Sequence, residues 1–161
     1  MPLEFCRIYW RFCVPERNTP LLIMGVSSDH SFKLPLVASP VRAGFPSPAD
    51  DYIETQLDLL EHLIHHPSAT YYIRVKGDSM QGLGINDADL LIVDRSLEPK
   101  QGYTVIASVD WELTCKRLEH INGSYYLIAG NDAYPPILLD NKEVHIWGVV
   151  IHSIHSHIGK I

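Results

Sequence analysis

Residues 103–118 have the sequence YTVIASVDWELTCKRL, which predicts a β-hairpin. Residues 103–109 and 112–118 read as two strands, and Asp110-Trp111 between them fits a tight turn. Because side chains alternate along a strand, Lys116 and Leu118 are predicted to share one face with Thr114. The adjacent cations Lys116 and Arg117 therefore point in opposite directions, so that Lys116 can be buried while Arg117 is not.

A serine upstream makes Lys116 a candidate catalytic base. The sequence Gly77-Asp78-Ser79-Met80 follows a predicted strand at about 71–76, so the Ser79 hydroxyl would stand just past a strand end. A serine hydroxyl is a poor nucleophile at neutral pH, and a neighbouring neutral lysine can take its proton. The reference pKa of lysine is about 10.4, and burial can lower it by about 3 or more. The backbone N–H groups of Ser79 and Met80 are candidates for holding a developing oxyanion.

Both residues also have plain structural interpretations. A Gly-x-Ser sequence is common in turns for backbone reasons alone. A Lys-Arg pair is most often part of an exposed edge strand. Asp78, one residue from Ser79, is interpreted as a residue that shapes the turn and not as the acid of a triad.

The rest of the chain predicts a mostly β fold. Further strands are expected at about 71–76, 89–94, 124–129 and 144–154, and short strands with turn signals indicate a compact, curled β-fold. Ser47-Pro48 is a typical helix start, with serine as the cap and proline in the first turn. Ile53, Leu57, Leu60 and Ile64 then recur at helical spacing, which predicts one short helix before the strands.

Residues 1–47 are predicted to form an extended, partly disordered arm. They show little periodicity and contain Pro2, Pro15, Pro20, Pro35, Pro40 and Pro46. Residues 1–43 carry five basic and three acidic side chains, whereas residues 44–161 carry eight basic and sixteen acidic ones. A body this acidic is not expected to bind nucleic acid directly, because contacts to phosphate dominate such binding.

Composition sets further limits. A length of 161 residues suggests one domain, and no apolar run approaches the roughly 18 residues of a membrane span. The three cysteines show no paired spacing, which fits a reducing, cytoplasmic compartment. The nine histidines include two clusters, but neither has zinc-site spacing to cysteine or carboxylate, so no metal or cofactor is expected.

Several motifs together resemble one family. They are Ala-Gly-Phe-Pro-Ser-Pro-Ala-Asp at 43–50, His-Pro-Ser-Ala-Thr at 66–70, Gly-Asp-Ser-Met at 77–80, Asp-Leu-Leu-Ile-Val-Asp at 89–94, Thr-Cys-Lys-Arg-Leu at 114–118 and Trp-Gly-Val-Val-Ile-His at 147–152. In order and spacing the chain resembles the UmuD-like proteins among the LexA-like self-cleaving serine peptidases of family S24. The resemblance covers about residues 43–155.

The resemblance implies a fold, a reaction and partners. The fold would be the LexA/UmuD C-terminal type. Ser79 would be the nucleophile, Lys116 the general base and Ala43–Gly44 the bond cut, leaving residues 44–161 as a serine peptidase and dimerisation domain. In the SOS response to DNA damage, a RecA–single-stranded-DNA filament would stimulate the cut. The processed homodimer would then act with a UmuC-type Y-family DNA polymerase in translesion synthesis.

Parts of the chain depart from the family, and alternatives remain. Residues 1–23 match no motif of the family and are either a misassigned start or an added extension, and no helix-turn-helix is recognised before the cut. The strand at 144–154, with Trp147, is the apolar surface expected to support dimerisation. A second interpretation is a non-catalytic dimeric regulatory module related to LexA-type repressors. A peptidase acting on other proteins, like a signal peptidase, ranks third because no membrane anchor is recognised.

Overall fold

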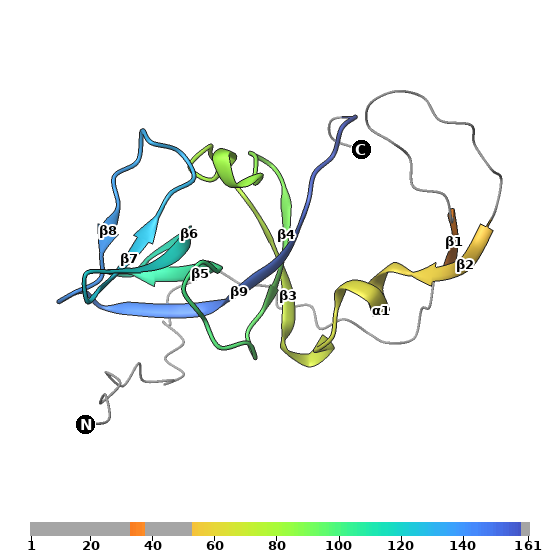
Figure 1. Cartoon of the computed structure of the whole chain (residues 1–161), viewed down its shortest axis with the longest axis horizontal. Helices are drawn as coiled ribbons and strands as arrows, with labels where there is room; N and C mark the ends of the chain where they lie inside the picture. Colours follow the sequence, from red (N-terminus) through yellow and green to blue (C-terminus); the bar gives the residue numbers. More distant parts are fainter. Residues whose placement is uncertain (1–32, 38–52, 159–161) are drawn as a thin grey trace.

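Two antiparallel sheets form the part of the chain that the computed structural model describes, residues 33–37 and 53–158 (Figure 1). The smaller sheet pairs β1 (Lys33–Val37) with β2 (Ile53–Asp58). The larger sheet has seven strands in the order β3-β4-β9-β5-β6-β7-β8. They are β3 (Thr70–Arg74), β4 (Leu90–Asp94), β5 (Thr104–Val109), β6 (Glu112–Ile121), β7 (Ser124–Ile128), β8 (Ile137–Leu138) and β9 (Val144–Ile154). The prediction of a mostly β fold is confirmed.

The predicted hairpin is present as β5 and β6. The two strands pair in antiparallel register from Thr104 opposite Arg117 to Val109 opposite Glu112. Asp110 and Trp111 form the two-residue turn, with φ values of 49° and 75°. Positive φ at both central residues is typical of the primed turns that match the twist of a hairpin. The register places Lys116 directly opposite Val105, a fully buried residue.

The large sheet curls around its longest strand, β9, as Figure 1 shows. Val144 to Val149 pair with β5, and Val149 to Ile154 pair with β4, so one strand joins the two halves of the sheet. Both ladders contain a register shift, and such irregularities increase local twist. A Cβ atom at Gly148 would lie 2.8 Å from a Val93 methyl carbon and 2.9 Å from the Asp94 carbonyl oxygen. Only glycine therefore fits where β9 passes β4. This close packing brings β3 and β4 near the β5–β6 hairpin.

The strand β5 is buried on both faces and separates two core clusters. Val105 and Ala107 belong to a cluster that also contains Leu118, Leu127 and Val149. Ile106 belongs to the other cluster, with Tyr71, Met80, Ile85, Leu91 and Val93. Because alternate residues of a strand face opposite sides, both clusters hold the hairpin in place. The position of Lys116 is therefore set by the core.

The strand that the sequence suggests as a dimer surface is β9, whose side chains are mostly half-buried, with Ile154 44% exposed. The strand β9 is paired on both edges, with β4 and β5. Trp147 is half-buried, packs against one core cluster, and its carbonyl oxygen accepts a hydrogen bond from the Tyr71 hydroxyl at 3.1 Å. Larger exposed apolar side chains lie at the tip of the hairpin, where Trp111 and Leu113 are 63% and 53% exposed.

The helix prediction is wrong over residues 53–58 and correct only for a shorter segment. Residues Ile53–Asp58 form β2, because they pair with β1, a non-local contact that the helical spacing did not reveal. The helix α1 covers Leu59–Leu63. Asp58 caps it, and its carboxylate accepts from the N–H groups of Leu60 and Glu61 at 3.0 and 3.2 Å.

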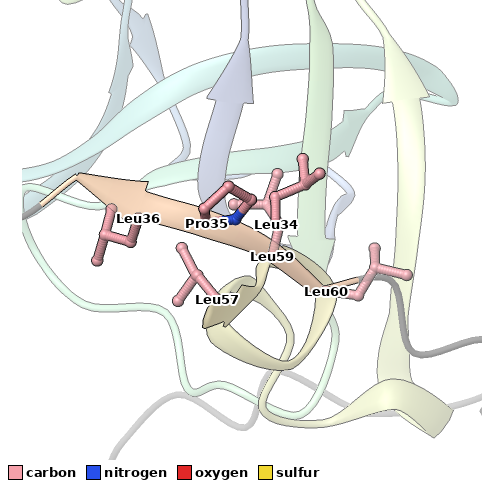
Figure 2. A pocket seen from close by; sticks show the side chains of 6 residues that line it. All are labelled: Leu34, Pro35, Leu36, Leu57, Leu59 and Leu60. Atoms are coloured by element: carbon pink, nitrogen blue, oxygen red, sulfur yellow. The ribbon is translucent and has the colours of Figure 1, made fainter. Parts of the chain in front are cut away.

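The ribbon of β1 and β2 carries an apolar groove, which Figure 2 shows from close by. Six apolar side chains line it: Leu34, Pro35, Leu36, Leu57, Leu59 and Leu60. In Figure 1 the ribbon stands apart from the seven-stranded sheet. The groove is therefore a separate feature from the serine and lysine described below.

A buried carboxylate stands at each end of β4, and each is hydrogen-bonded to a histidine. Asp94 accepts from the Ser96 N–H at 2.7 Å and lies 2.6 Å from His66 Nδ1, while Asp89 lies 2.5 Å from His155 Nδ1. Both aspartates are only 2% exposed. These contacts tie the segments before β3 and after β9 to the middle of the sheet.

Three of the sequence predictions lie outside the described residues, and the helix start at Ser47-Pro48 is the first of them. The second is the arm, which apart from β1 covers residues 1–32 and 38–47. The third is the Ala43–Gly44 bond, in the segment 38–52 that connects β1 to β2. The strand β8 was not predicted from the sequence.

Candidate active site

Ser79 lies in the turn between β3 and the 3-10 helix η2 (Gln81–Leu83). The base of this turn is closed by a hydrogen bond from the Val75 N–H to the Asp89 carbonyl oxygen at 2.8 Å. Gly77 reverses the chain with a φ of +98°, a conformation that favours glycine, and its N–H donates to the Asp87 carboxylate at 2.6 Å. Ser79 follows this reversal by two residues.

Met80 fixes the turn to the core. Its side chain is 1% exposed and belongs to the cluster around Leu91 and Val93. Its carbonyl oxygen accepts from the N–H groups of Leu83 and Ile85 at 3.0 and 3.3 Å. Ser79, the preceding residue, is half-buried, so its hydroxyl lies at the rim of the core and not within it.

Lys116 meets Ser79 directly. Its Nζ lies 2.8 Å from Ser79 Oγ and 3.0 Å from the Cys115 carbonyl oxygen. The side chain comes from the middle of β6 and is 7% exposed. The predicted burial of Lys116 on the same face as Leu118 is thus observed. Burial lowers the pKa of Lys116 below its ordinary value, with the charge of Cys115 opposing this effect.

A second loop crosses the serine turn at two glycines. The Gly130 N–H donates to the Ser79 carbonyl oxygen at 2.8 Å, and the Gly82 N–H donates to the Gly130 carbonyl oxygen at 2.7 Å. A Cβ atom at Gly82 would lie 2.3 Å from that carbonyl oxygen, and one at Gly130 would lie 3.1 Å from the Met80 carbonyl oxygen. The two backbones can approach this closely only because neither position carries a side chain.

Two backbone donors remain beside the serine hydroxyl. Within residues 33–37 and 53–158, neither the Ser79 nor the Met80 N–H donates to another group of the chain. Free donors next to a nucleophile are the usual means of stabilising an oxyanion. The Ser79 and Met80 N–H groups therefore remain candidates for this role.

The loop between β7 and β8 adds residues that sequence reasoning missed. The Tyr134 hydroxyl donates to Asp78 Oδ1 at 2.5 Å, and Asn131 Nδ2 lies 3.4 Å from the Asp78 backbone and carboxylate oxygens. The Tyr134 ring centroid lies 5.8 Å from Lys116 Nζ. The available signal was local: Gly130-Asn131-Asp132 before Tyr134 and Pro135-Pro136 after it mark a turn, but they do not say what the turn contacts.

The site brings together three of the predicted residues, Ser79, Met80 and Lys116. The other two, Ala43 and Gly44, lie outside the described residues. In the described part of the chain, no three His, Cys, Asp or Glu side chains gather as a set of metal ligands. The Ser79 hydroxyl lies within hydrogen-bond distance of Lys116, a buried lysine whose pKa is lowered. A serine–lysine dyad requires this arrangement.

Residues 35–151 match the family described as Peptidase S24-like, which is more than half of the chain. The chain belongs to the Peptidase S24-like family. Protein MucA of Salmonella typhimurium is 43% identical over 135 residues, a match that covers 83% of this chain and 90% of MucA. Protein SamA of Salmonella typhimurium is 44% identical over 122 residues, covering 76% of this chain and 85% of SamA.

The chain is also similar to a repressor. The LexA repressor of Shewanella woodyi is 36% identical over 125 residues, a match that covers 76% of this chain and 60% of the repressor. The resemblance to LexA-like and UmuD-like S24 proteins is therefore confirmed. Among the helices of residues 33–37 and 53–158, none has both the length and the apolar character needed to cross a bilayer.

Proposed function

We propose that the chain is a serine peptidase that cuts itself between Ala43 and Gly44. The observation that carries this proposal is the 2.8 Å contact between Lys116 Nζ and Ser79 Oγ in a nearly buried setting. Membership of the Peptidase S24-like family supports it, because a peptidase of this kind needs both a nucleophile and a base.

The first step of the reaction uses neutral Lys116 as the base. Its Nζ takes the proton of Ser79 Oγ, and the oxygen attacks the carbonyl carbon of Ala43. The N–H groups of Ser79 and Met80 donate to the resulting oxyanion, since they have no other acceptor in the described part of the chain. When the intermediate collapses, the C–N bond to Gly44 breaks and Lys116 returns the proton to the leaving amine.

The second step regenerates the serine. Ala43 is now held as an ester on Ser79 Oγ, and Lys116 takes a proton from a water molecule that attacks this ester. The ester bond breaks, Oγ recovers its proton, and the products are residues 1–43 and 44–161. Lys116 is protonated and deprotonated once in each half of the reaction, so a pKa near the working pH favours both halves.

The position of the expected bond in the chain supports self-cleavage. The strands β1 and β2 pair antiparallel, with Val37 opposite Ile53, so both ends of the segment 38–52 are held together. A bond in this segment is tethered to the serine and lysine by the same polypeptide. Tethering raises the effective concentration of a substrate far above that of a separate peptide.

The biological role we propose is the one the family resemblance implies. A RecA–single-stranded-DNA filament stimulates the cut by favouring the conformer in which Ala43–Gly44 reaches Ser79, which is a population shift. The processed species, residues 44–161, is a homodimer that joins a UmuC-type Y-family polymerase in translesion synthesis after DNA damage. The acidic residues 44–161 fit protein partners better than nucleic acid.

Purified full-length protein and two variants test the proposal. Wild type, Ser79→Ala and Lys116→Ala are incubated at alkaline pH, with and without an activated RecA filament, and the intact chain is followed over time. We expect wild type to be cut and both variants to stay whole while keeping their far-UV circular dichroism. Appreciable cutting by Ser79→Ala would refute the assignment, and an uncut wild type under every condition would favour a non-catalytic regulatory module.

A further inference from the structure

Tyr134 connects the two halves of the serine–lysine pair. Its hydroxyl donates to Asp78, the residue immediately before Ser79, at 2.5 Å. Its ring centroid lies 5.8 Å from Lys116 Nζ. The Tyr134 side chain thus contacts the turn that carries Ser79, and its ring lies near the amine of Lys116.

The loop that carries Tyr134 is itself tied to the serine turn. The Gly130 N–H donates to the Ser79 carbonyl oxygen, and the Asn131 side-chain amide lies 3.4 Å from the Asp78 carbonyl oxygen. Asn131 also organises the loop, because its side-chain oxygen accepts from the Ala133 N–H at 3.0 Å and its carbonyl oxygen accepts from the Tyr134 N–H at 3.0 Å. Tyr134 is therefore held in place by the contacts that also fix Ser79.

Tyr134 nevertheless remains on the surface. It is 41% exposed, whereas Lys116 beneath its ring is 7% exposed. The carboxylate of Asp78 raises the pKa of the Tyr134 phenol, first through the hydrogen bond and then through its charge. The raised pKa favours the protonated phenol, which is the form that donates to Asp78.

We infer that Tyr134 is a positioning residue for the proposed self-cleavage, acting through Asp78 to orient Ser79 and covering Lys116 with its ring. This inference rests on the proposed function, because the pair must be catalytic for its orientation to matter. A misplacement of reacting groups by about 1 Å can reduce a rate by about 100-fold. The hydroxyl of Tyr134 therefore contributes to the rate although it touches neither reacting atom.

A set of variants in the full-length chain tests the contact. Tyr134→Phe keeps the ring and removes the hydroxyl, and Asp78→Ala removes its acceptor. We expect each to slow self-cleavage at alkaline pH by about tenfold or more, and the double variant to be no slower than the slower single one. Asp78→Asn keeps an acceptor oxygen for the phenol and should retain most of the rate.

The pH profile separates orientation from a merely structural effect. Tyr134→Phe should lower the rate at every pH without moving the pH at which the rate is half maximal, because the ring still covers Lys116. A matched control is Tyr125→Phe: Tyr125 is 44% exposed and stacks on His120, and its hydroxyl has no partner among the described residues. This control should cleave within about twofold of wild type.

A measurement that needs no cleavage tests the contact independently. In the uncleavable Ser79→Ala protein, the Tyr134 phenol is titrated by NMR with labelled tyrosine, with and without Asp78→Asn. Its pKa should fall when the carboxylate is neutralised, since the charge that raised it is gone. An unchanged pKa would overturn the inference even if wild type cleaves.

The possible outcomes distinguish the two proposals. If wild type and Tyr134→Phe are both inert, the proposed function fails. If wild type cleaves and Tyr134→Phe cleaves as fast, or if the Asp78 and Tyr134 effects multiply in the double variant, only this inference fails.

Discussion

A single residue, Lys116, supplies the base of the proposed reaction. Its Nζ touches Ser79 Oγ and the Cys115 carbonyl oxygen, and burial lowers its pKa. Below this lowered pKa the lysine is protonated and cannot act as a base; above it the lysine is neutral. Self-cleavage should therefore accelerate with pH and level off below the ordinary pKa of lysine. Initial cleavage rates from pH 6 to pH 10 measure this.

Two substitutions check that the pH dependence belongs to Lys116. Lys116→Arg should abolish cleavage at every pH in this range, since arginine stays charged. Lys100→Met, a change at an exposed lysine, should leave the profile unaltered. A rate that does not depend on pH, or a profile that Lys100→Met shifts, would argue against Lys116 as the base.

The close approach of Gly82 and Gly130 holds the two loops of the site together. In Gly82→Ala, the new Cβ would lie 2.3 Å from the Gly130 carbonyl oxygen, so one of the two backbones must move. Overpacking of this kind costs about 1–3 kcal/mol, and we expect a loss of that size in urea unfolding together with a large loss of cleavage. Gly123→Ala is the control: its φ is +88° but nothing lies within 4 Å, so it should lose stability and keep its cleavage rate. Equal cleavage by both variants would show that the crossing does not position Ser79.

The buried carboxylate of Asp94 in β4 should make the stability of the fold depend on pH. Burial acts to raise the pKa of Asp94, but hydrogen bonds from Ser96 and His66 hold it below its usual value. A lowered carboxylate pKa stabilises the fold above the unfolded-state pKa of 3.8, and this stability is lost as the pH falls. Asp94→Asn should therefore cost about 1–3 kcal/mol near pH 6 and progressively less below about pH 4.

Urea unfolding at pH 6 and at pH 3 measures the Asp94 effect. Asp132→Asn, at an exposed residue, is the control and should match wild type at both values. A difference between Asp94→Asn and wild type that stays constant with pH would contradict the linkage.

The elements that were predictable from the sequence are those encoded by local pattern. Alternation and the Asp110-Trp111 turn identified the hairpin and the buried face of Lys116, and the motif spacing paired it with Ser79. Residues 53–58 have helical spacing but form a strand because they pair with β1, which lies across a long connection. The contacts of Tyr134 could not be predicted from the sequence either. They depend on the close approach of two distant loops at Gly82 and Gly130.

The processed molecule, residues 44–161, should assemble as a dimer. The seven-stranded sheet lies entirely within residues 70–154, so removal of residues 1–43 leaves it intact. The hairpin tip exposes Trp111 and Leu113, which gives residues 44–161 apolar surface for a symmetric contact. We expect this fragment to sediment as a dimer at micromolar concentration. A clean monomer would count against the proposed processed homodimer.

Mass spectrometry of the full-length protein after incubation at alkaline pH shows directly whether the chain cuts itself between Ala43 and Gly44. We expect two products, residues 1–43 and 44–161, with the new termini at Ala43 and Gly44, and no products from Ser79→Ala protein treated in parallel. New termini at any other bond, or an intact chain at every pH with an activated filament present, would contradict this expectation.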